Sequence, residues 1–154
     1  MNAERFTLDS NILVYAVDSK SAARHRLATA LVDAAGDADC VLTRQALGEF
    51  FHAVTRKGIA SRAAAASQVH DWMTIFATVG VEDAALRDAL KLAVTGRLSY
   101  WDALLVATAQ QAECSFVLSE DMHDRHQFGS VTIRHPFAGA DLAPDLRSLI
   151  GLDR

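Results

Sequence analysis

The sequence predicts an α/β domain in which helices cover both faces of a mainly parallel sheet. Short β-like segments alternate with longer helical segments along most of the 154 residues, an order typical of parallel strands joined by crossover helices. The connections are short, and no proline before Pro136 interrupts a helix. With 51% hydrophobic residues, the chain can bury one core, so we expect a single domain over residues 1–154.

Short runs of apolar and β-branched residues are the expected strands. Most are followed by polar or turn residues, which is typical of strands buried in a sheet. The five runs are Phe6 to Asp9, Cys40 to Thr43, Ala77 to Val81, Cys114 to Ser119 and Val131 to Arg134. We expect Cys40 and Cys114 to be free, buried thiols.

Longer segments between these strands are the expected helices. They are Ser10 to Val17, Ala22 to Ala35, Arg44 to Lys57, Ser61 to Phe76, Asp83 to Val94 and Tyr100 to Ala112. In the third helix, Leu47, Phe50, Phe51 and Val54 recur at helical spacing and predict a core-facing stripe.

Composition and charge indicate a soluble cytoplasmic protein. The first residues lack a basic region followed by an apolar one, and the chain contains no apolar stretch of about 18 residues. We therefore expect no membrane association. The formal net charge of −4 gives no global attraction to nucleic acid, so any such binding must come from a local patch.

Four carboxylates stand at the edges of apolar segments, where folding alone needs no acid: Asp9, Glu49, Asp102 and Asp121. Asp9 ends the first strand and Asp121 follows the fourth, so both would overhang one crevice if these strands are neighbours. Glu49 and Asp102 would approach from adjacent helices. An oxygen-only ligand set suits Mg²⁺ or Mn²⁺ and predicts a metal-dependent phosphoryl-transfer enzyme.

Each of these acids also has a purely structural explanation. Asp9 could be the N-cap of the following helix, and Asp102 follows Ser99 at the spacing of a capping box. Glu49 falls on the flank of its own helix, beside the core stripe, where a solvated glutamate is usual. The metal-site hypothesis therefore depends on all four acids together.

The turn around Asp121 offers rival acids. Glu120 and Asp124 lie in the same segment, and acids are common in turns. The sequence leaves open whether either of them joins the site.

Four segments resemble the ordered motifs of PIN-domain ribonucleases, and more narrowly the VapC-type toxins of type II toxin–antitoxin pairs. They are LDSNILVYAVD (Leu8 to Asp18), TRQALGEFFHAVTRK (Thr43 to Lys57), LSYWDALLVATAQQAEC (Leu98 to Cys114) and VLSEDMHDRHQFGSVTIRHPF (Val117 to Phe137). The resemblance reaches about Phe137 and leaves residues 138–154 as a C-terminal tail. It implies a three-layer α/β/α sandwich around a mainly parallel, five-stranded sheet.

The resemblance also implies roles for individual residues. The catalytic acids would be Asp9, Glu49, Asp102 and Asp121, of which Asp9, Asp102 and Asp121 would hold one or two Mg²⁺ or Mn²⁺ ions. Ser10, Asn11 and Ser119 would orient these ligands or contact a phosphate. The implied reaction is hydrolysis of RNA phosphodiester bonds by water that the metal activates.

Contacts with RNA are less defined. Arg44, Arg97 and Arg125 are candidates for gripping the phosphate backbone. Tyr100 and Trp101 directly precede Asp102 and could stack a splayed base, although we expect Trp101 to pack in the core.

A toxin of this type implies a small antitoxin partner that masks the site with an Arg or Lys, and a homodimer. Apolar residues in Ser61 to Phe76 and in Leu142 to Ile150 could serve either interface, but packing on their own core is the default expectation. The alternatives are an RNA-maturation nuclease and a non-catalytic interaction module of the same fold. A phosphatase resembling haloacid dehalogenases is a weaker alternative, because its chemistry needs a second acid two residues after Asp9, at the position of Asn11.

Overall fold

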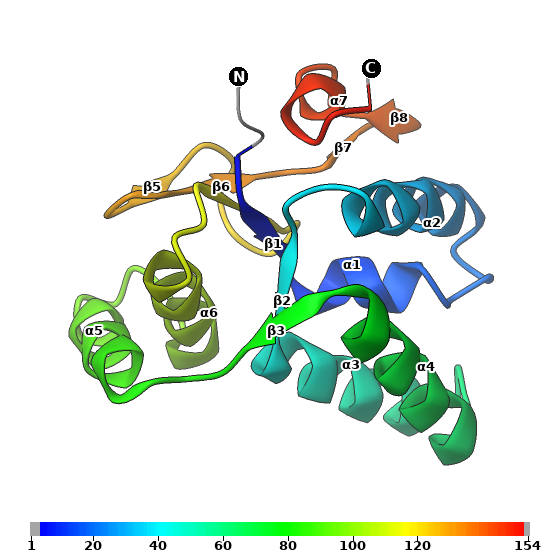
Figure 1. The fold of residues 1–154 in the computed structure, drawn as a ribbon, viewed down its shortest axis with the longest axis horizontal. Helices are drawn as coiled ribbons and strands as arrows, with labels where there is room; N and C mark the ends of the chain where they lie inside the picture. The colour runs from blue at the N-terminus through cyan, green and yellow to red at the C-terminus, as the bar shows by residue number, and fades with distance from the viewer. Residues whose placement is uncertain (1–3, 153–154) are drawn as a thin grey trace.

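The computed structural model describes residues 4–152 and shows the strands at the centre of the fold with helices on both sides (Figure 1). A four-stranded sheet has the order β1-β4-β6-β5. It consists of β1 (Phe6–Leu8), β4 (Phe116–Leu118) and β6 (Val131–Arg134), which pair in parallel, and β5 (Gln127–Phe128), which is antiparallel to β6.

Two further strands form a separate parallel pair, β2 (Val41–Thr43) and β3 (Ala77–Val79). A single bridge between Phe6 and Cys40 connects this pair to β1. All five predicted strands therefore form, but the prediction of one five-stranded sheet is wrong. β1 and β2 meet at that one bridge, and the short β5 occupies the edge beyond β6.

Six helices lie within two residues of their predicted bounds. They are α1 (Ser10–Tyr15), α2 (Ala22–Gly36), α3 (Arg44–Arg56), α4 (Arg62–Ile75), α5 (Asp83–Val94) and α6 (Tyr100–Gln111). Side chains cap several of them: Thr43 accepts a hydrogen bond from the Ala46 N–H at the start of α3, and Ser61 accepts one from the Ala64 N–H at the start of α4.

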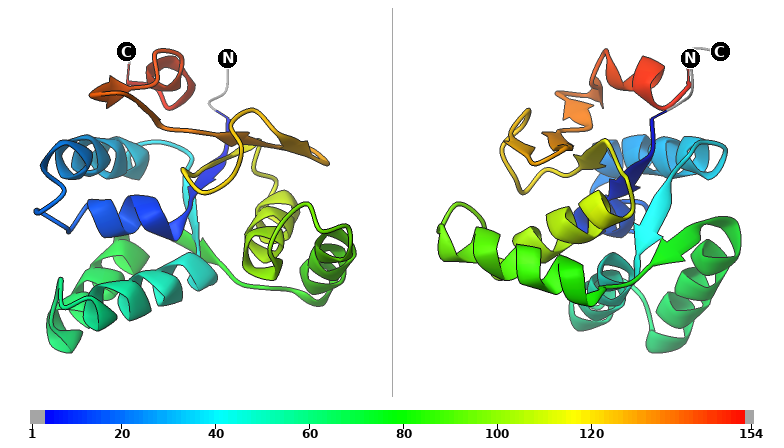
Figure 2. Two further views of the ribbon diagram at one scale, coloured as in Figure 1. Left: turned by 180° about the vertical axis from the view of Figure 1, so that it is seen from behind. Right: turned by 60° about the vertical axis from the view of Figure 1, so that its left-hand side comes forward.

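The sheet separates two layers of helices, because successive side chains of a strand point to opposite faces. On one face, Phe6, Leu8, Phe116 and Leu118 pack in a core with α1, α2, α3 and α4. On the other, Val117 and Ile133 pack against α6, and α5 packs on α6 in turn. Figures 1 and 2 show α5 and α6 on one side of the sheet and α1 and α2 on the other. This is the predicted α/β/α sandwich.

The C-terminal segment forms elements that the sequence did not predict: the hairpin of β7 (Phe137–Ala138) and β8 (Asp141–Leu142), and the single-turn helix α7 (Leu146–Leu149). Leu142, Leu146 and Ile150 are buried in the core on the side of α1 and α2. The default expectation for this segment is confirmed. In the segment Ser61 to Phe76 the same expectation holds for Ala65, Trp72 and Phe76, which are buried in this core, but not for Met73 and Ile75, which are exposed.

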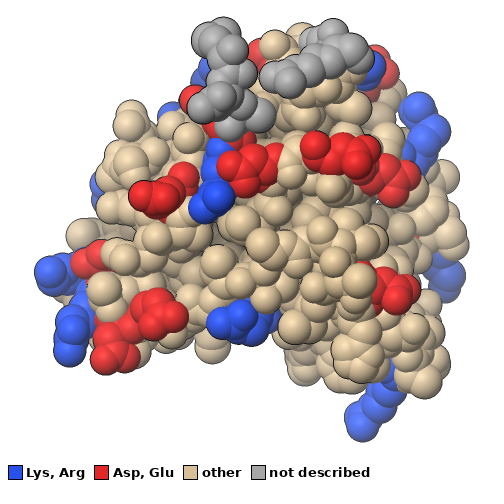
Figure 3. All heavy atoms as spheres, viewed as in Figure 1, with Lys and Arg blue, Asp and Glu red and all other residues tan. Residues whose placement is uncertain are grey.

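The surface and the thiols fit the composition. On the face shown in Figure 3, Lys and Arg side chains are scattered and form no continuous basic surface. Cys40 and Cys114 are free and buried, as predicted. No helix within residues 4–152 is long and apolar enough to span a bilayer.

Candidate active site

Asp9 is fixed at the carboxyl end of β1 and is 5% exposed. Its N–H donates to the Leu118 carbonyl at 2.9 Å, so the pairing of β1 with β4 continues one residue beyond the strand. Its carboxylate accepts a hydrogen bond from the Ser10 N–H at 2.7 Å and so caps α1. The helix-cap explanation is thus correct, but it accounts for only one of the two carboxylate oxygens.

The Ser119 hydroxyl connects Asp9 to Asp121. This side chain is fully buried after β4 and donates to Oδ2 of Asp9 at 2.6 Å. The Ser119 hydroxyl oxygen in turn accepts a hydrogen bond from the Asp121 N–H at 3.1 Å. Because β1 and β4 are parallel neighbours with Leu8 opposite Leu118, one hydroxyl can orient the acids that follow both strands.

Asp102 enters from the first turn of α6. Ser99 is the N-cap of this helix, and its hydroxyl accepts a hydrogen bond from the Asp102 N–H at 3.2 Å. The capping bond that the sequence suggested is therefore present. It fixes the backbone of Asp102 and leaves the carboxylate half-buried, where the charge of Asp121 reaches it.

Glu49 lies on α3 and faces the other acids. Gln45, one turn earlier, donates its side-chain N–H to Oε1 of Glu49 at 2.8 Å and to the Trp101 carbonyl at 3.0 Å. The Ser10 side chain lies close enough to lower the pKa of Glu49, against the effect of burial. The interpretation of Glu49 as a solvated residue is wrong, because α1 and the start of α6 cover the flank that the helical wheel left open.

The electrostatics of the site follow from burial and from the mutual repulsion of the acids. Burial raises the pKa of Asp9 to about 6, against the opposing hydrogen bonds from Ser119 and Ser10, and the charges of Asp121 and Asp102 raise this pKa further. Burial also raises the pKa of Glu49 and of Asp102, and the charge of Asp121 adds to both increases. Ionising all the acids together is therefore costly.

The donor chemistry of the cluster fits a hard divalent cation. The four acids offer only carboxylate oxygens, and added positive charge would relieve their repulsion. Within residues 4–152, however, no three His, Cys, Asp or Glu side chains stand close enough to hold a metal ion as they are placed. Binding would require rotation of side chains, which is available to Glu49 and Asp102, which are half-buried, and to Asp121, which is exposed.

Asn11 provides an independent sign of an incomplete polar site. Both atoms of its side-chain amide, Nδ2 and Oδ1, are buried without a hydrogen-bond partner among the described residues. A buried amide without partners is costly, and this one lies in the first turn of α1, two residues after Asp9. It fits the prediction that Asn11 contacts a ligand or a phosphate.

The rival acids of the turn are engaged elsewhere. Glu120 pairs with Arg24 at 3.1 Å and contacts Tyr15, whose pKa is raised by burial and by the charge of Glu120. Asp124 accepts from the His135 N–H at 2.8 Å. Both carboxylates therefore stabilise the loop and the C-terminal region.

The three arginines predicted to contact RNA are spread over the molecule. Arg44 donates to Thr78 Oγ1 at 3.2 Å and lies across Gly80, where an added Cβ would be 2.6 Å from its Nη2. Arg97 stacks on the Phe128 ring, 4.9 Å from the centroid, at a hollow of about 420 Å³ between α5, α6 and the β5–β6 hairpin.

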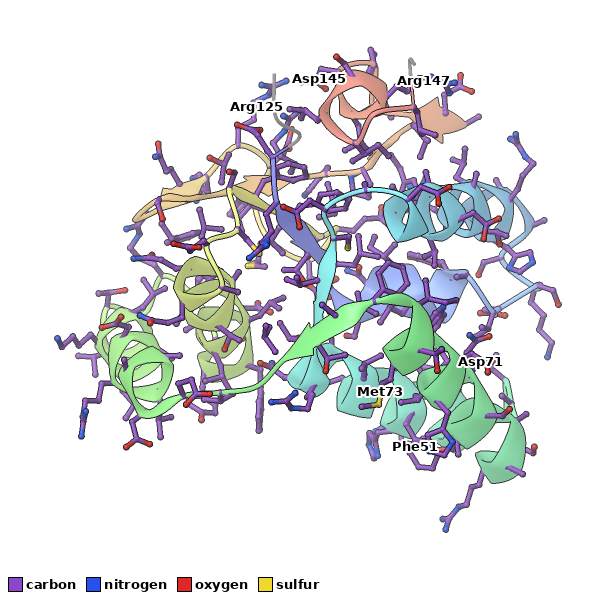
Figure 4. All side chains as sticks on the ribbon, viewed as in Figure 1. Phe51, Asp71, Met73, Arg125, Asp145 and Arg147 are labelled. Atoms are coloured by element: carbon purple, nitrogen blue, oxygen red, sulfur yellow. The ribbon has the colours of Figure 1, made fainter. Side chains whose placement is uncertain are left out.

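Arg125 lies beside α7, away from α3 and α4 (Figure 4). Its guanidinium is 3.5 Å from Asp145. Asp145 also pairs with Arg134 at 2.5 Å, and this hydrogen bond is the main cause that lowers the pKa of Asp145. Arg125 thus belongs to an ion-pair group that connects α7 to the loop after β4.

The expectation that Trp101 packs in the core is wrong. Its side chain is 60% exposed, whereas Trp72 is 5% exposed. From residue 103 to residue 109, α6 is buried on all sides. The spacing of its apolar residues therefore does not predict which residue of the first turn faces solvent. Trp101 lies in the first turn, before the buried part of the helix, and its side chain is exposed to solvent.

Comparisons with known proteins agree with this architecture. The sequence model of the PIN domain family matches residues 6–127. VapC20 of Mycobacterium tuberculosis, described as a sarcin-ricin loop cleaving toxin, has a similar structure with a TM-score of 0.64 at 17% identity, covering 75% of this chain and 89% of that chain. No curated protein matches the sequence at a significant level.

Two complexes contain chains of similar structure. In VapBC2 from Rickettsia felis, bound to a promoter DNA fragment, the TM-score is 0.62 at 12% identity over 85% of this chain and 98% of that chain. In DNA-bound VapBC from Salmonella typhimurium, it is 0.61 at 12% identity over 86% of this chain and 98% of that chain. At such identities the likeness concerns the fold.

Proposed function

The chain belongs to the PIN domain family, and from this premise we propose that it is a divalent-metal-dependent endoribonuclease, the toxin of a type II toxin–antitoxin pair. The observation that supports it most is the convergence of Asp9, Glu49, Asp102 and Asp121 from four separate elements. The pKa values of Asp9, Glu49 and Asp102 are all raised, and the charge of Asp121 contributes to each increase. Folding alone gives no reason to gather these charges.

Asp9, Asp102 and Asp121 would hold one or two Mg²⁺ or Mn²⁺ ions. When bound, such a cation supplies positive charge to the phosphoryl oxygens and makes water a stronger nucleophile. The protein residues provide the positioning. Ser119 fixes the oxygen of Asp9 that α1 does not use, and Gln45 holds Glu49 toward the cluster. Glu49, whose pKa is raised mainly by burial, is the candidate to accept a proton from the attacking water.

Cleavage of RNA by the purified protein tests the nuclease proposal. We expect Mg²⁺- or Mn²⁺-dependent cleavage that EDTA stops and that Asp102→Asn abolishes without loss of the fold. Asp88→Asn, an exposed acid on α5, is the matched control and should cleave like the wild type. Cleavage by Asp102→Asn at the wild-type rate would contradict the assignment.

The antitoxin proposal is supported by the similarity of the fold to chains of VapBC complexes. A hollow of about 360 Å³ between α3 and α4 offers an apolar surface for a partner, lined by Leu47, Phe51, Val69 and Met73 among others. Figure 4 shows Phe51 and Met73 in this region. A basic side chain of the antitoxin would neutralise the acid cluster.

Expression in a bacterial host tests the toxin proposal. We expect growth arrest that a small neighbouring open reading frame relieves, and no arrest with Asp102→Asn. Normal growth in the presence of active, soluble protein would favour an RNA-maturation nuclease. Growth arrest by a cleavage-inactive variant would favour the non-catalytic interaction module. We also propose that the protein is a homodimer and acts in the cytoplasm.

A further inference from the structure

Trp101 combines wide exposure with a fixed position beside the acids. Its carbonyl accepts a hydrogen bond from Gln45 at 3.0 Å, and the same Gln45 nitrogen holds Glu49 at 2.8 Å. Asp102 is the next residue of the chain. The backbone of Trp101 is therefore held beside Glu49 and Asp102, and its exposed indole projects from this point.

The ring is also held by a neighbouring aromatic side chain. Tyr100 packs on the core between α5 and α6, and Trp101 meets it edge to face, with ring centroids 4.9 Å apart at an angle of 68°. This contact limits the rotation of the indole, and 60% of the side chain stays exposed. A large, oriented and exposed aromatic surface at a polar rim is suited to stacking.

Charge favours a nucleobase as the stacked group. The acid cluster and the net charge of −4 repel the phosphates of RNA, so affinity near the site must come partly from contacts that do not depend on charge. Stacking on an aromatic ring provides one, because every base has a π-face. A base within a duplex is already stacked on its neighbours, so this contact selects an unpaired base.

We propose that Trp101, supported by Tyr100, is the platform that stacks an unpaired RNA base next to the scissile phosphate. This inference depends on the proposed nuclease function and extends it, because it assigns to Trp101 the binding of a base beside the reacting phosphate. An exposed tryptophan can also be a contact between proteins, and the experiment below separates these roles.

Tryptophan fluorescence of the full chain gives a direct test, because Trp101 is exposed and Trp72, the other tryptophan, is buried against Phe50. We would titrate the cleavage-inactive Asp9→Asn variant with a short single-stranded RNA of mixed sequence. We expect saturable quenching of the Trp101 emission, and little quenching by the same RNA annealed to its complement. The emission of Trp72 reports that the fold is unchanged.

Substitutions at Trp101 separate stacking from a structural effect. In the Asp9→Asn background, Trp101→Ala should weaken binding of the single strand about tenfold, and Trp101→Phe, which keeps a ring, by less than about threefold. With Asp9 restored, Trp101→Ala should raise KM about tenfold and change kcat by less than about threefold.

Three results would overturn the inference. If the RNA binds, as fluorescence anisotropy of a labelled strand reports, but leaves the Trp101 emission unchanged, the ring is not stacked and the nuclease proposal stands. If Trp101→Ala binds RNA normally but breaks a dimer in sedimentation velocity, the ring is a protein contact. If the wild type neither binds nor cleaves RNA, the proposed function fails together with the inference.

Discussion

Asp9 shows how one residue serves both the fold and the site. It caps α1 with one carboxylate oxygen and accepts the Ser119 hydroxyl with the other, and it is almost completely buried. Burial raises its pKa to about 6 from an ordinary value of 3.8. The folded protein therefore binds a proton at Asp9 more tightly than the unfolded chain does.

The stability of the metal-free protein should reflect this raised pKa. Well below pH 3.8 both the folded and the unfolded state are protonated at Asp9, and the residue costs no stability. As the pH rises from there to about 6, the unfolded chain ionises first, so the fold loses up to about 3 kcal/mol. Asp9→Asn, whose amide oxygen can still cap α1, should therefore stabilise the metal-free protein near pH 7.5 and much less near pH 4. Chemical denaturation in EDTA measures the difference.

The exposed Asp33 on α2 is the control for this prediction. Asp33→Asn should change the free energy of unfolding by less than about 0.5 kcal/mol at either pH. Equal stability of the wild type and Asp9→Asn near pH 7.5 would mean that ionised Asp9 is not destabilising.

Ser119 acts through Asp9 and Asp121. Ser119→Ala removes one of the two hydrogen bonds that orient the Asp9 carboxylate and the bond that holds the Asp121 backbone. We therefore expect about tenfold weaker divalent-cation binding, not its loss. Isothermal titration with Mn²⁺ checks this, with Ser130→Ala, in the exposed β5–β6 turn, as the control. Unchanged affinity in Ser119→Ala would show that the hydroxyl has only a packing role.

At the scale of elements, two helices begin with the same serine cap but differ in what they carry. Ser99 caps α6, whose first turn holds Asp102, whereas Ser61 caps α4, which holds none of the four acids. Ser99→Ala and Ser61→Ala should each cost about 1 kcal/mol of stability. Only Ser99→Ala should also slow RNA cleavage, because it loosens the backbone of Asp102.

Chemical denaturation measures the stability of Ser99→Ala and Ser61→Ala, and RNA cleavage is measured under conditions in which both variants are folded. Equal cleavage by the two variants would mean that the cap of α6 does not position Asp102.

The elements with clear apolar patterns were predictable from the sequence. α1 to α6 and the five predicted strands follow from runs of core residues bounded by turns and caps. β5, β7, β8 and α7 are two to four residues long, and such short segments carry no usable period. They form because the rest of the chain already supplies the strand edge or the core surface on which they pack.

The candidate site was predictable in its residues but less so in its surroundings. Asp9 and Asp121 follow strand ends, so the parallel topology alone brings them together. Glu49 could not be placed by its own helix, because its environment comes from α1 and α6. The position of Trp101 is undetermined by pattern for the same reason: a helix that is apolar on all sides gives no exposed face.

At the scale of the molecule, the C-terminal segment is part of the core although it lies beyond the residues that match the PIN family. Leu146 of α7 is fully buried, and Leu146→Ala should destabilise the protein by about 3 kcal/mol through the cavity that it leaves. Leu90→Ala, at a position 49% exposed on α5, should cost less than about 1 kcal/mol.

Thermal or chemical denaturation checks this pair. Similar stabilities of the two variants would show that the C-terminal segment does not contribute to the core of the protein in solution.

The central claim is that Asp9, Glu49, Asp102 and Asp121 act together on a divalent cation while Glu120 and Asp124 do not. Titration of the wild type with Mn²⁺, with the free ion followed by its paramagnetic resonance signal, tests this most directly. We expect Asp9→Asn, Asp102→Asn and Asp121→Asn to weaken binding by about tenfold or more, and Glu120→Gln and Asp124→Asn to bind like the wild type. Wild-type affinity in Asp9→Asn or Asp121→Asn, or an equal loss in Glu120→Gln, would contradict the account.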